Sequence, residues 1–120
     1  MIPPLVLVAE DDPELRELVA LTLTDAGMDV EEARDGHEAL AHVVARKPDL
    51  VLLDMRMPGM DGRAFCTALR ELGELGEPPR VVVMTAGDRA AQTAAELGAV
   101  SWLAKPFDID ELVATVRRSL

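Results

Sequence analysis

Short apolar runs alternate with amphipathic segments along the chain. Residues 5–9 and 50–53 are apolar at every position, which is typical of parallel strands buried on both faces. The segments between such runs place apolar residues at helical spacing and end near glycine or proline. The pattern predicts strands at 5–9, 29–33, 50–53, 80–85 and 101–104. It predicts helices at 13–26, at 36–46, from 63, at 89–97 and after Asp108.

The alternation of strands and helices with short connections predicts a parallel sheet. Crossovers between parallel strands are right-handed, and successive helices therefore cover both faces of the sheet. At 120 residues the chain can build one domain with one substantial core. We therefore expect residues 1–120 to form a doubly wound, three-layer α/β domain with five parallel strands.

Signals at the helix ends support these boundaries. Asp12 is expected to cap the first helix, with Pro13 at its first position and Gly27 at its end. Asp108 and Glu111 form a capping-box-like pair before the last helix. The expected return loop before the fourth strand contains Gly73, Gly76, Pro78 and Pro79. The residues expected on inner helix faces are Ala39, Leu40, Val43, Val44, Phe65, Leu69, Leu72, Ile109, Leu112, Val113 and Val116.

Composition excludes some classes of function. The chain has 22 acidic and 12 basic residues, a net charge of −10, and no basic stripe that could neutralise nucleic-acid phosphates. Direct binding of nucleic acid is therefore not expected. No apolar stretch approaches the length of a membrane span, and the N-terminus lacks the features of a signal peptide. Because Cys66 is the only cysteine, an internal disulfide is excluded, and we expect a cytoplasmic protein.

Polar side chains follow several of the apolar runs, at the edge where open α/β sheets bind ligands. Glu10 and Asp11 follow the first run, Asp54 ends the third, and Thr85 and Lys105 lie at the fourth and fifth. If the first and third strands are neighbours, three carboxylates converge. At about 5 Å each pair repels by about 3 kcal/mol at an effective dielectric near 20. A divalent cation relieves this repulsion, and oxygen ligands favour Mg²⁺ or Mn²⁺.

The same residues suit phosphoryl transfer. The cation and Lys105 would balance charge on a transferring phosphoryl group, and the Thr85 hydroxyl would donate a hydrogen bond. Asp54 would be the oxygen nucleophile and form an aspartyl phosphate. Simpler roles exist: Asp11 could cap a helix, Lys105 could be a solvated loop residue, and Thr85 could merely end a strand. A capping role suits Asp54 less, because a long loop follows it.

Other polar residues have simpler interpretations. His37 and His42 are five positions apart and do not share a helix face, so we expect both to be solvated. Cys66 is expected to be a small buried filler. The alanine-rich segment 89–97 has a thin apolar face, which leads to the hypothesis that this helix has low local stability.

Four segments combine an acidic pair, an aspartate before a Met-Pro loop, a threonine and a Lys-Pro pair. They are residues 6–13 (VLVAEDDP), 49–62 (DLVLLDMRMPGMDG), 84–86 (MTA) and 102–107 (WLAKPF). With this combination the chain resembles the receiver domain of response regulators in two-component signalling, including chemotaxis regulators. The resemblance covers nearly all of the chain and implies a flavodoxin-like strand order 2-1-3-4-5.

The resemblance implies a role for each acidic residue and for the loop after the third strand. Asp54 would accept the phosphoryl group. Asp11 would bind Mg²⁺ directly, and Glu10 would bind it through water. The main-chain carbonyl of Arg56 would complete the protein's ligands. Gly87 has no side chain to orient an attacking water, so slow to moderate self-dephosphorylation is expected, although Arg56 could act in either direction.

The resemblance also implies how a signal would be passed on. Thr85 would be the switch hydroxyl, and Lys105 would pair with the phosphoryl group and precede Pro106 by a cis bond. Trp102 stands where the family mostly carries Tyr, Phe or His, a ring that swings inward with the threonine; a fixed packing role is the alternative. The donor would be a sensor histidine kinase or phosphotransfer protein, and the recipient an output protein or effector domain.

Three other classes of function compete with this interpretation. A phosphatase of the haloacid-dehalogenase type would need an acid at Arg56 and usually a cap domain. A flavin-binding electron carrier would need a loop rich in Ser, Thr and Gly in place of residues 10–12. An interaction module independent of phosphorylation would not need the complete set of acids, threonine and lysine. The receiver interpretation describes a signalling domain that turns over no free substrate.

Overall fold

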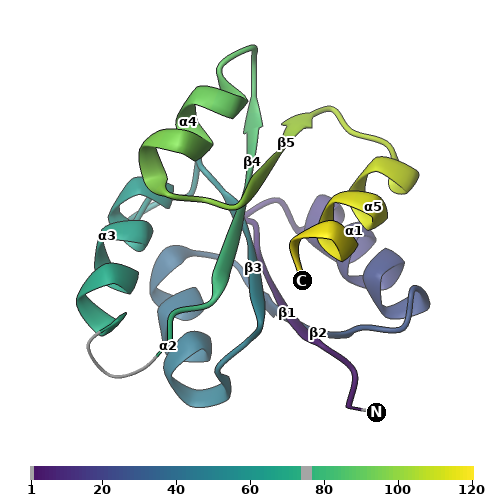
Figure 1. Cartoon of the computed structure of the whole chain (residues 1–120), viewed down its shortest axis with the longest axis horizontal. Coiled ribbons are helices and arrows are strands. Elements are labelled where there is room, and N and C mark those ends of the chain that lie inside the picture. The colour runs from purple at the N-terminus through teal and green to yellow at the C-terminus, as the bar shows by residue number, and fades with distance from the viewer. Residues whose placement is uncertain (1, 74–76) are drawn as a thin grey trace.

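The computed structural model describes residues 2–73 and 77–120 and contains a five-stranded parallel sheet (Figure 1). The strand order β2-β1-β3-β4-β5 confirms the predicted doubly wound fold. The strands are β1 (Leu5–Ala9), β2 (Asp29–Ala33), β3 (Leu50–Asp54), β4 (Arg80–Ala86) and β5 (Ser101–Lys105). The helices are α1 (Pro13–Asp25), α2 (Gly36–Arg46), α3 (Gly62–Leu72), α4 (Ala90–Leu97) and α5 (Ile109–Ser119). Within the described part of the chain, no helix is long and apolar enough to cross a membrane.

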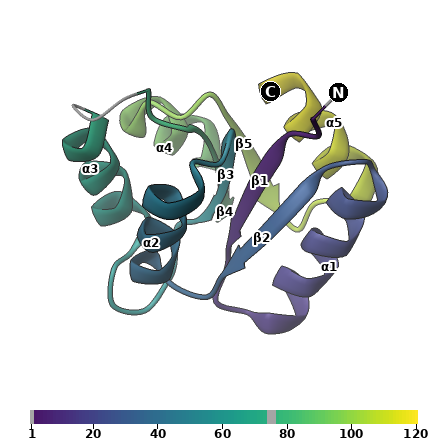
Figure 2. The ribbon, with the colours of Figure 1, turned by 90° about the horizontal axis from the view of Figure 1, so that it is seen from below.

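Two apolar layers attach the helices to the sheet. Helices α1 and α5 cover one face, where Val19 and Leu112 are buried, and α2, α3 and α4 cover the other, where Ala39, Phe65 and Ala94 are buried (Figure 2). Because side chains alternate along a strand, each central strand contributes to both layers. The first layer contains Val6, Val8, Leu50 and Leu52, and the second contains Leu7, Ala9, Val51 and Leu53. This division explains why these strands are apolar at every position.

The predicted boundaries agree with the structure to within about one residue. Strands β3, β4 and β5 each run one residue further than predicted, because Asp54 still pairs with Met84 and Ala86 with Lys105. Helix α4 begins one residue later than predicted, at Ala90. The predicted return loop before β4 is described only at Gly73, Pro78 and Pro79, since Gly76 lies outside the described residues.

Aspartate caps begin most of the helices. The predicted caps are confirmed: Asp12 accepts from the backbone N–H of Glu14, and Asp108 accepts from that of Glu111 at 2.7 Å. Asp35 and Asp61 cap α2 and α3 in the same way. Each such cap satisfies a backbone donor that would otherwise lack a partner. Helix α4 differs, because Arg89 precedes it and makes no side-chain cap within the described residues.

Three predictions about side-chain position are wrong. Val44 was expected on the inner face of α2 but is 62% exposed, because the buried stripe of this helix runs through Ala39 and Val43. Ile109 is also exposed, because α5 is rotated so that its buried stripe runs through Leu112 and Val116. His42 is not simply solvated: its Nδ1 lies 2.6 Å from Oε1 of Glu31, a partly buried carboxylate that needs a partner.

Two predictions about single side chains are confirmed. His37 is exposed, as expected for a solvated residue of α2. Cys66 is buried and free, as expected for a small filler on α3. Burial raises the pKa of the Cys66 thiol, which favours the unreactive protonated form.

Candidate functional site

The carboxyl ends of the strands bring the predicted acids together. Strand β1 pairs with β3, so the residues that follow β1 lie beside the end of β3. Carboxylate oxygens of Glu10, Asp11 and Asp54 lie within 4.8 Å of one another, which confirms the predicted convergence. Strand topology creates this cluster, because Asp54 is more than forty positions from Glu10 and Asp11 in sequence.

Two of the three carboxylates are buried and share one cation. Glu10 is 1% exposed and Asp54 is 4% exposed, whereas Asp11 is exposed to solvent. Nζ of Lys105 lies 3.1 and 3.2 Å from the two carboxylate oxygens of Glu10 and 3.3 Å from Oδ1 of Asp54. Lys105 therefore bridges the ends of β1 and β3 from β5. Buried charges persist only when they are paired in this way.

The Glu10 carboxyl group has a raised pKa. Burial raises its pKa to about 7, and the neighbouring Asp54 carboxylate adds to the rise. Lys105 opposes the shift but does not cancel it. Burial and the neighbouring carboxylate therefore favour the protonated form of Glu10, and the Lys105 ammonium group offsets only part of this effect.

The chemistry of these residues fits a small divalent cation. The available ligands are carboxylate oxygens from Glu10, Asp11 and Asp54, and neither histidine nor cysteine contributes to the cluster. Hard oxygen ligands of this kind suit Mg²⁺, which commonly binds one or two carboxylates and keeps water in its remaining positions. The structure therefore contains an acidic cluster that could hold a metal. The assignment of direct binding to Asp11 and of water-mediated binding to Glu10 stays a prediction.

The loop after β3 packs closely against the start of α2. The backbone N–H of Arg56 donates to Oδ1 of Asp54 at 3.2 Å, which ties the loop to the acid. A Cβ atom on Gly36 would lie 2.5 Å from the backbone oxygen of Met60, so only glycine fits there without movement. The loop that carries the Arg56 carbonyl is therefore held in place by backbone contact as well as by a hydrogen bond.

The residues predicted to act as a switch lie on the more open side of the site. Thr85 is partly buried, and its hydroxyl donates to the backbone carbonyl of Ala86 at 3.4 Å rather than to a carboxylate. Trp102 is 46% exposed on β5. The peptide bond between Lys105 and Pro106 is cis, as predicted. The proposed roles of Thr85 and Trp102 stay predictions.

Sequence patterns gave no indication of one residue beside the acids. Arg16, in the first turn of α1, donates from Nη1 to the backbone carbonyl of Glu10 at 2.9 Å. Its Nε also lies 3.5 Å from Oε1 of Glu32 on β2. Because an arginine on a helix is usually a solvated residue, only the tertiary structure reveals these contacts.

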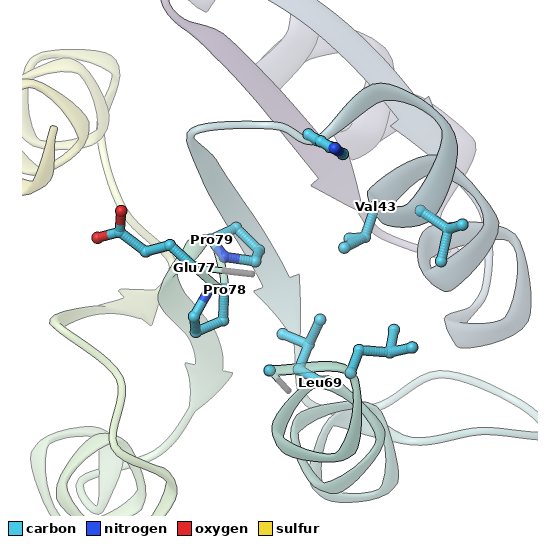
Figure 3. A pocket seen from close by; sticks show the side chains of 9 residues that line it. Val43, Leu69, Glu77, Pro78 and Pro79 are labelled. Carbon is cyan, nitrogen blue, oxygen red and sulfur yellow. The ribbon is translucent and has the colours of Figure 1, made fainter. Parts of the chain in front are cut away.

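A separate pocket of about 340 Å³ lies at the opposite end of the sheet, between the carboxyl ends of α2 and α3 (Figure 3). Val43, Leu69, Pro78 and Pro79 line it, and the Glu77 carboxylate points away from Val43 and Leu69 (Figure 3). The pocket is mainly apolar and is remote from the carboxyl ends of the strands. The acidic cluster therefore does not depend on it.

Comparison with known families agrees with the geometry of the acidic cluster. Residues 6–117 match the model of the response regulator receiver domain. The chain therefore belongs to this family and is a phosphoryl-accepting domain of two-component signalling.

Individual relatives show the same relationship at moderate identity. Response regulator MprA of Mycolicibacterium vanbaalenii is 39% identical over 120 residues, which cover 98% of this chain and 51% of MprA. The DNA-binding transcriptional regulator NtrC of Salmonella typhimurium is 39% identical over 118 residues, which cover 97% of this chain and 24% of NtrC. The chemotaxis protein CheY4 of Vibrio cholerae has a solved structure with a TM-score of 0.88 and 34% identity, covering 98% of this chain and 99% of CheY4. The chain thus spans about half or less of these curated relatives, but nearly all of CheY4.

Proposed function

We propose that Asp54 is the phosphoryl acceptor and that Mg²⁺ bound by Glu10, Asp11 and Asp54, with the Arg56 carbonyl, assists the transfer. Mn²⁺ would serve in the same way. The observation that carries the proposal is the position of Lys105, whose ammonium group contacts both buried carboxylates at the mouth of the sheet. Phosphoryl transfer needs a nucleophilic oxygen, a positive charge beside it and a site for a metal ion, and the Asp54 carboxylate, the Lys105 ammonium group and the acidic cluster would supply these.

The donor in this proposal is a phosphohistidine on a sensor kinase or phosphotransfer protein. A carboxylate oxygen of Asp54 attacks phosphorus, a P–O bond forms, and the P–N bond to the histidine breaks. The electron pair of the broken bond stays on the imidazole, which takes up a proton from solvent as it regains its neutral form. Mg²⁺, when bound, neutralises charge on the phosphoryl oxygens. Lys105 already lies beside Asp54 and would pair with the new phosphoryl group.

The phosphoryl group is removed by hydrolysis. Attack of water on the phosphoryl group breaks the P–O bond and returns the Asp54 carboxylate and inorganic phosphate. Under this proposal the chain catalyses only its own phosphorylation and dephosphorylation. Gly87 offers no side chain to orient the water, and we propose a phosphoryl lifetime longer than seconds. A lifetime of seconds or less, measured by loss of the adduct over time, would contradict this.

The signal would pass to another protein. We propose that the Thr85 hydroxyl turns from the Ala86 carbonyl toward the phosphoryl group, and that Trp102 either follows it or stays fixed as a packing residue. The net charge of −10 disfavours direct contact with nucleic acid, so the recipient is an output protein or an effector domain. We place this exchange in the cytoplasm, and we treat residues 1–120 as one receiver unit.

Phosphorylation by a small molecule tests the assignment of Asp54. The chain is incubated with acetyl phosphate and Mg²⁺, and intact-mass spectrometry is used to look for one added phosphoryl group. We expect the adduct in the wild type and in Asp110→Asn, a control that alters an exposed aspartate on α5. We expect none in Asp54→Asn. An adduct of the same mass and yield in Asp54→Asn would show that another residue is the acceptor.

A further inference from the structure

Arg16 is the cation closest in sequence to the acidic pair, and its side chain folds back toward that pair. Its guanidinium donates from Nη1 to the Glu10 carbonyl at 2.9 Å, and its side chain is only 20% exposed. Its Nε approaches Oε1 of Glu32 at 3.5 Å. The guanidinium therefore connects the turn after β1 with the edge strand β2.

These contacts complete the support of one short turn. The backbone N–H of Glu10 donates to the carbonyl of Ala33 at 3.0 Å, at the end of β2. The Arg16 side chain binds the carbonyl of the same residue, so both polar groups of Glu10's backbone have partners outside the turn. Within the turn, Asp12 caps α1. Rotation of the peptide between Glu10 and Asp11, which would redirect both carboxylates, would break the bond to Arg16.

The charge of Arg16 and its position predict opposite effects on a bound cation. A guanidinium beside the cluster repels a divalent cation by Coulomb's law, so charge alone would make removal of Arg16 tighten metal binding. A group that orients metal ligands has the reverse effect, since its removal typically weakens metal affinity 10- to 100-fold. The direction of the change therefore separates the two roles.

We propose that Arg16 is a positioning residue, which holds the Glu10–Asp11 turn in its metal-binding geometry through the Glu10 carbonyl. This inference rests on the proposed function, because it assumes that the acidic cluster binds Mg²⁺. It predicts that loss of Arg16 raises the Mg²⁺ concentration needed for half-saturation. Phosphorylation at saturating Mg²⁺ should be unchanged.

The test compares Mg²⁺ titrations of the wild type, Arg16→Gln and Arg16→Lys. Binding is followed by amide chemical shifts in heteronuclear NMR and by Trp102 emission, neither of which requires phosphorylation. We expect the midpoint of Arg16→Gln to rise about tenfold, in line with loss of an orienting hydrogen bond. Arg16→Lys keeps the charge but loses the planar fork, and we expect its midpoint to rise as well.

Two further variants locate the effect. Glu32→Gln removes the carboxylate that holds the guanidinium, and we expect a smaller rise in the same direction. Arg63→Gln is the matched control, because Arg63 also makes a partly exposed pair, with Glu96 at 3.1 Å between α3 and α4. We expect its midpoint to match the wild type. Thermal unfolding without metal shows whether each variant is folded at the titration temperature.

Each outcome decides the proposal. A raised midpoint in both Arg16 variants, with phosphorylation by acetyl phosphate restored at saturating Mg²⁺, supports the positioning role. An unchanged or lowered midpoint in Arg16→Gln overturns it, and Arg16→Lys gives the same decision if the glutamine variant does not fold. If the wild type itself shows no Mg²⁺-dependent change and no phosphoryl adduct, the proposed function fails rather than this inference.

Discussion

The edge of the sheet that carries the acidic cluster has two sides, and these differ in how many contacts hold their side chains. On the side of β1 and β3, Glu10 and Asp54 are buried and share Lys105, and the adjoining helix α1 has an aspartate cap. On the side of β4 and α4, the Thr85 hydroxyl makes only a long bond to its neighbour's carbonyl, and α4 begins without a side-chain cap in the described residues. Under the proposed function, the first side is already assembled for phosphoryl transfer, and the second side, where the switch is proposed, is held by fewer contacts.

This difference follows from the cost of buried charge. Carboxylates removed from water must have partners. Lys105 on β5 therefore donates to Glu10, at the end of β1, and to Asp54 on β3. A neutral hydroxyl and a short alanine-rich helix carry no such requirement. We therefore expect the proposed acceptor to be held more rigidly than Thr85 and α4 at the same edge of the sheet, and four predictions test that contrast.

The largest effect is expected from removing the shared cation. Lys105→Met leaves two buried carboxylates without their partner, and we expect the free energy of unfolding at pH 8 to fall by about 3–5 kcal/mol. At pH 5 the loss should be smaller, because Glu10 is then protonated. Denaturant unfolding at both pH values measures this. Lys47→Met is the control, since Lys47 is exposed and makes no ion pair among residues 2–73 and 77–120. Equal losses at the two pH values would contradict the ionic role of Lys105.

The second largest effect expected is the pH dependence of the free energy of unfolding, measured without a divalent cation. Because the folded-state pKa of Glu10 is raised from 4.5 to about 7, the folded protein binds a proton more tightly than the unfolded chain. The contribution of this proton to the free energy of unfolding is fully present below pH 4.5. It is lost as the pH rises through about 7, by up to about 3 kcal/mol. Denaturant unfolding in EDTA from pH 5 to pH 8 measures the slope.

Glu10→Gln is the control for this pH dependence, because the amide has no proton to lose. We expect the difference in stability between the wild type and Glu10→Gln to change across this range. Added Mg²⁺ should reduce the wild-type loss, since a cation favours the ionised carboxylate. Parallel stability curves for the two proteins would show that Glu10 titrates normally.

A smaller effect is expected from the close contact that holds the loop after β3. Gly36→Ala places a methyl group against the Met60 backbone, and we expect a loss of about 2 kcal/mol in the free energy of unfolding. Gly73→Ala is the matched control, because its φ is −58° and a Cβ there meets no described atom within 4 Å. That variant should be neutral or slightly stabilising. Equal stabilities of the two variants would mean that the loop adapts freely.

The smallest effect concerns the two helix starts. We expect native-state hydrogen exchange in α4 to report an opening free energy about 1 kcal/mol lower than in α1, because only α1 has a side-chain cap. Arg89→Ser adds a capping hydroxyl to α4 and should slow its exchange. Asp12→Ala removes the cap of α1 and should speed exchange there. If α4 exchanges no faster than α1 in the wild type, the hypothesis of low local stability is wrong.

The sequence by itself determined the order of elements and indicated the residues that we propose carry the chemistry. Apolar runs such as Leu50–Leu53 and caps such as Asp12 are local signals. The run shows which faces of a strand are apolar, and the cap bonds to backbone N–H groups two or three residues away. The rule that ligands bind at the carboxyl ends of parallel strands then placed Glu10, Asp11 and Asp54 at one edge. The strand order itself came from the resemblance to receiver domains, since periodicity does not say which strands are neighbours.

Only the tertiary structure decided how these residues meet. Lys105 reaches Glu10 across 95 positions, and Arg16 and His42 pair with Glu32 and Glu31 on β2, to which no local pattern connects them. The same limit explains the errors at Val44 and Ile109, whose apolar character says nothing about the direction in which a helix is rotated on the sheet. Local patterns report which surfaces prefer burial, whereas pairing between distant charges depends on three-dimensional distance and on the loss of water around them.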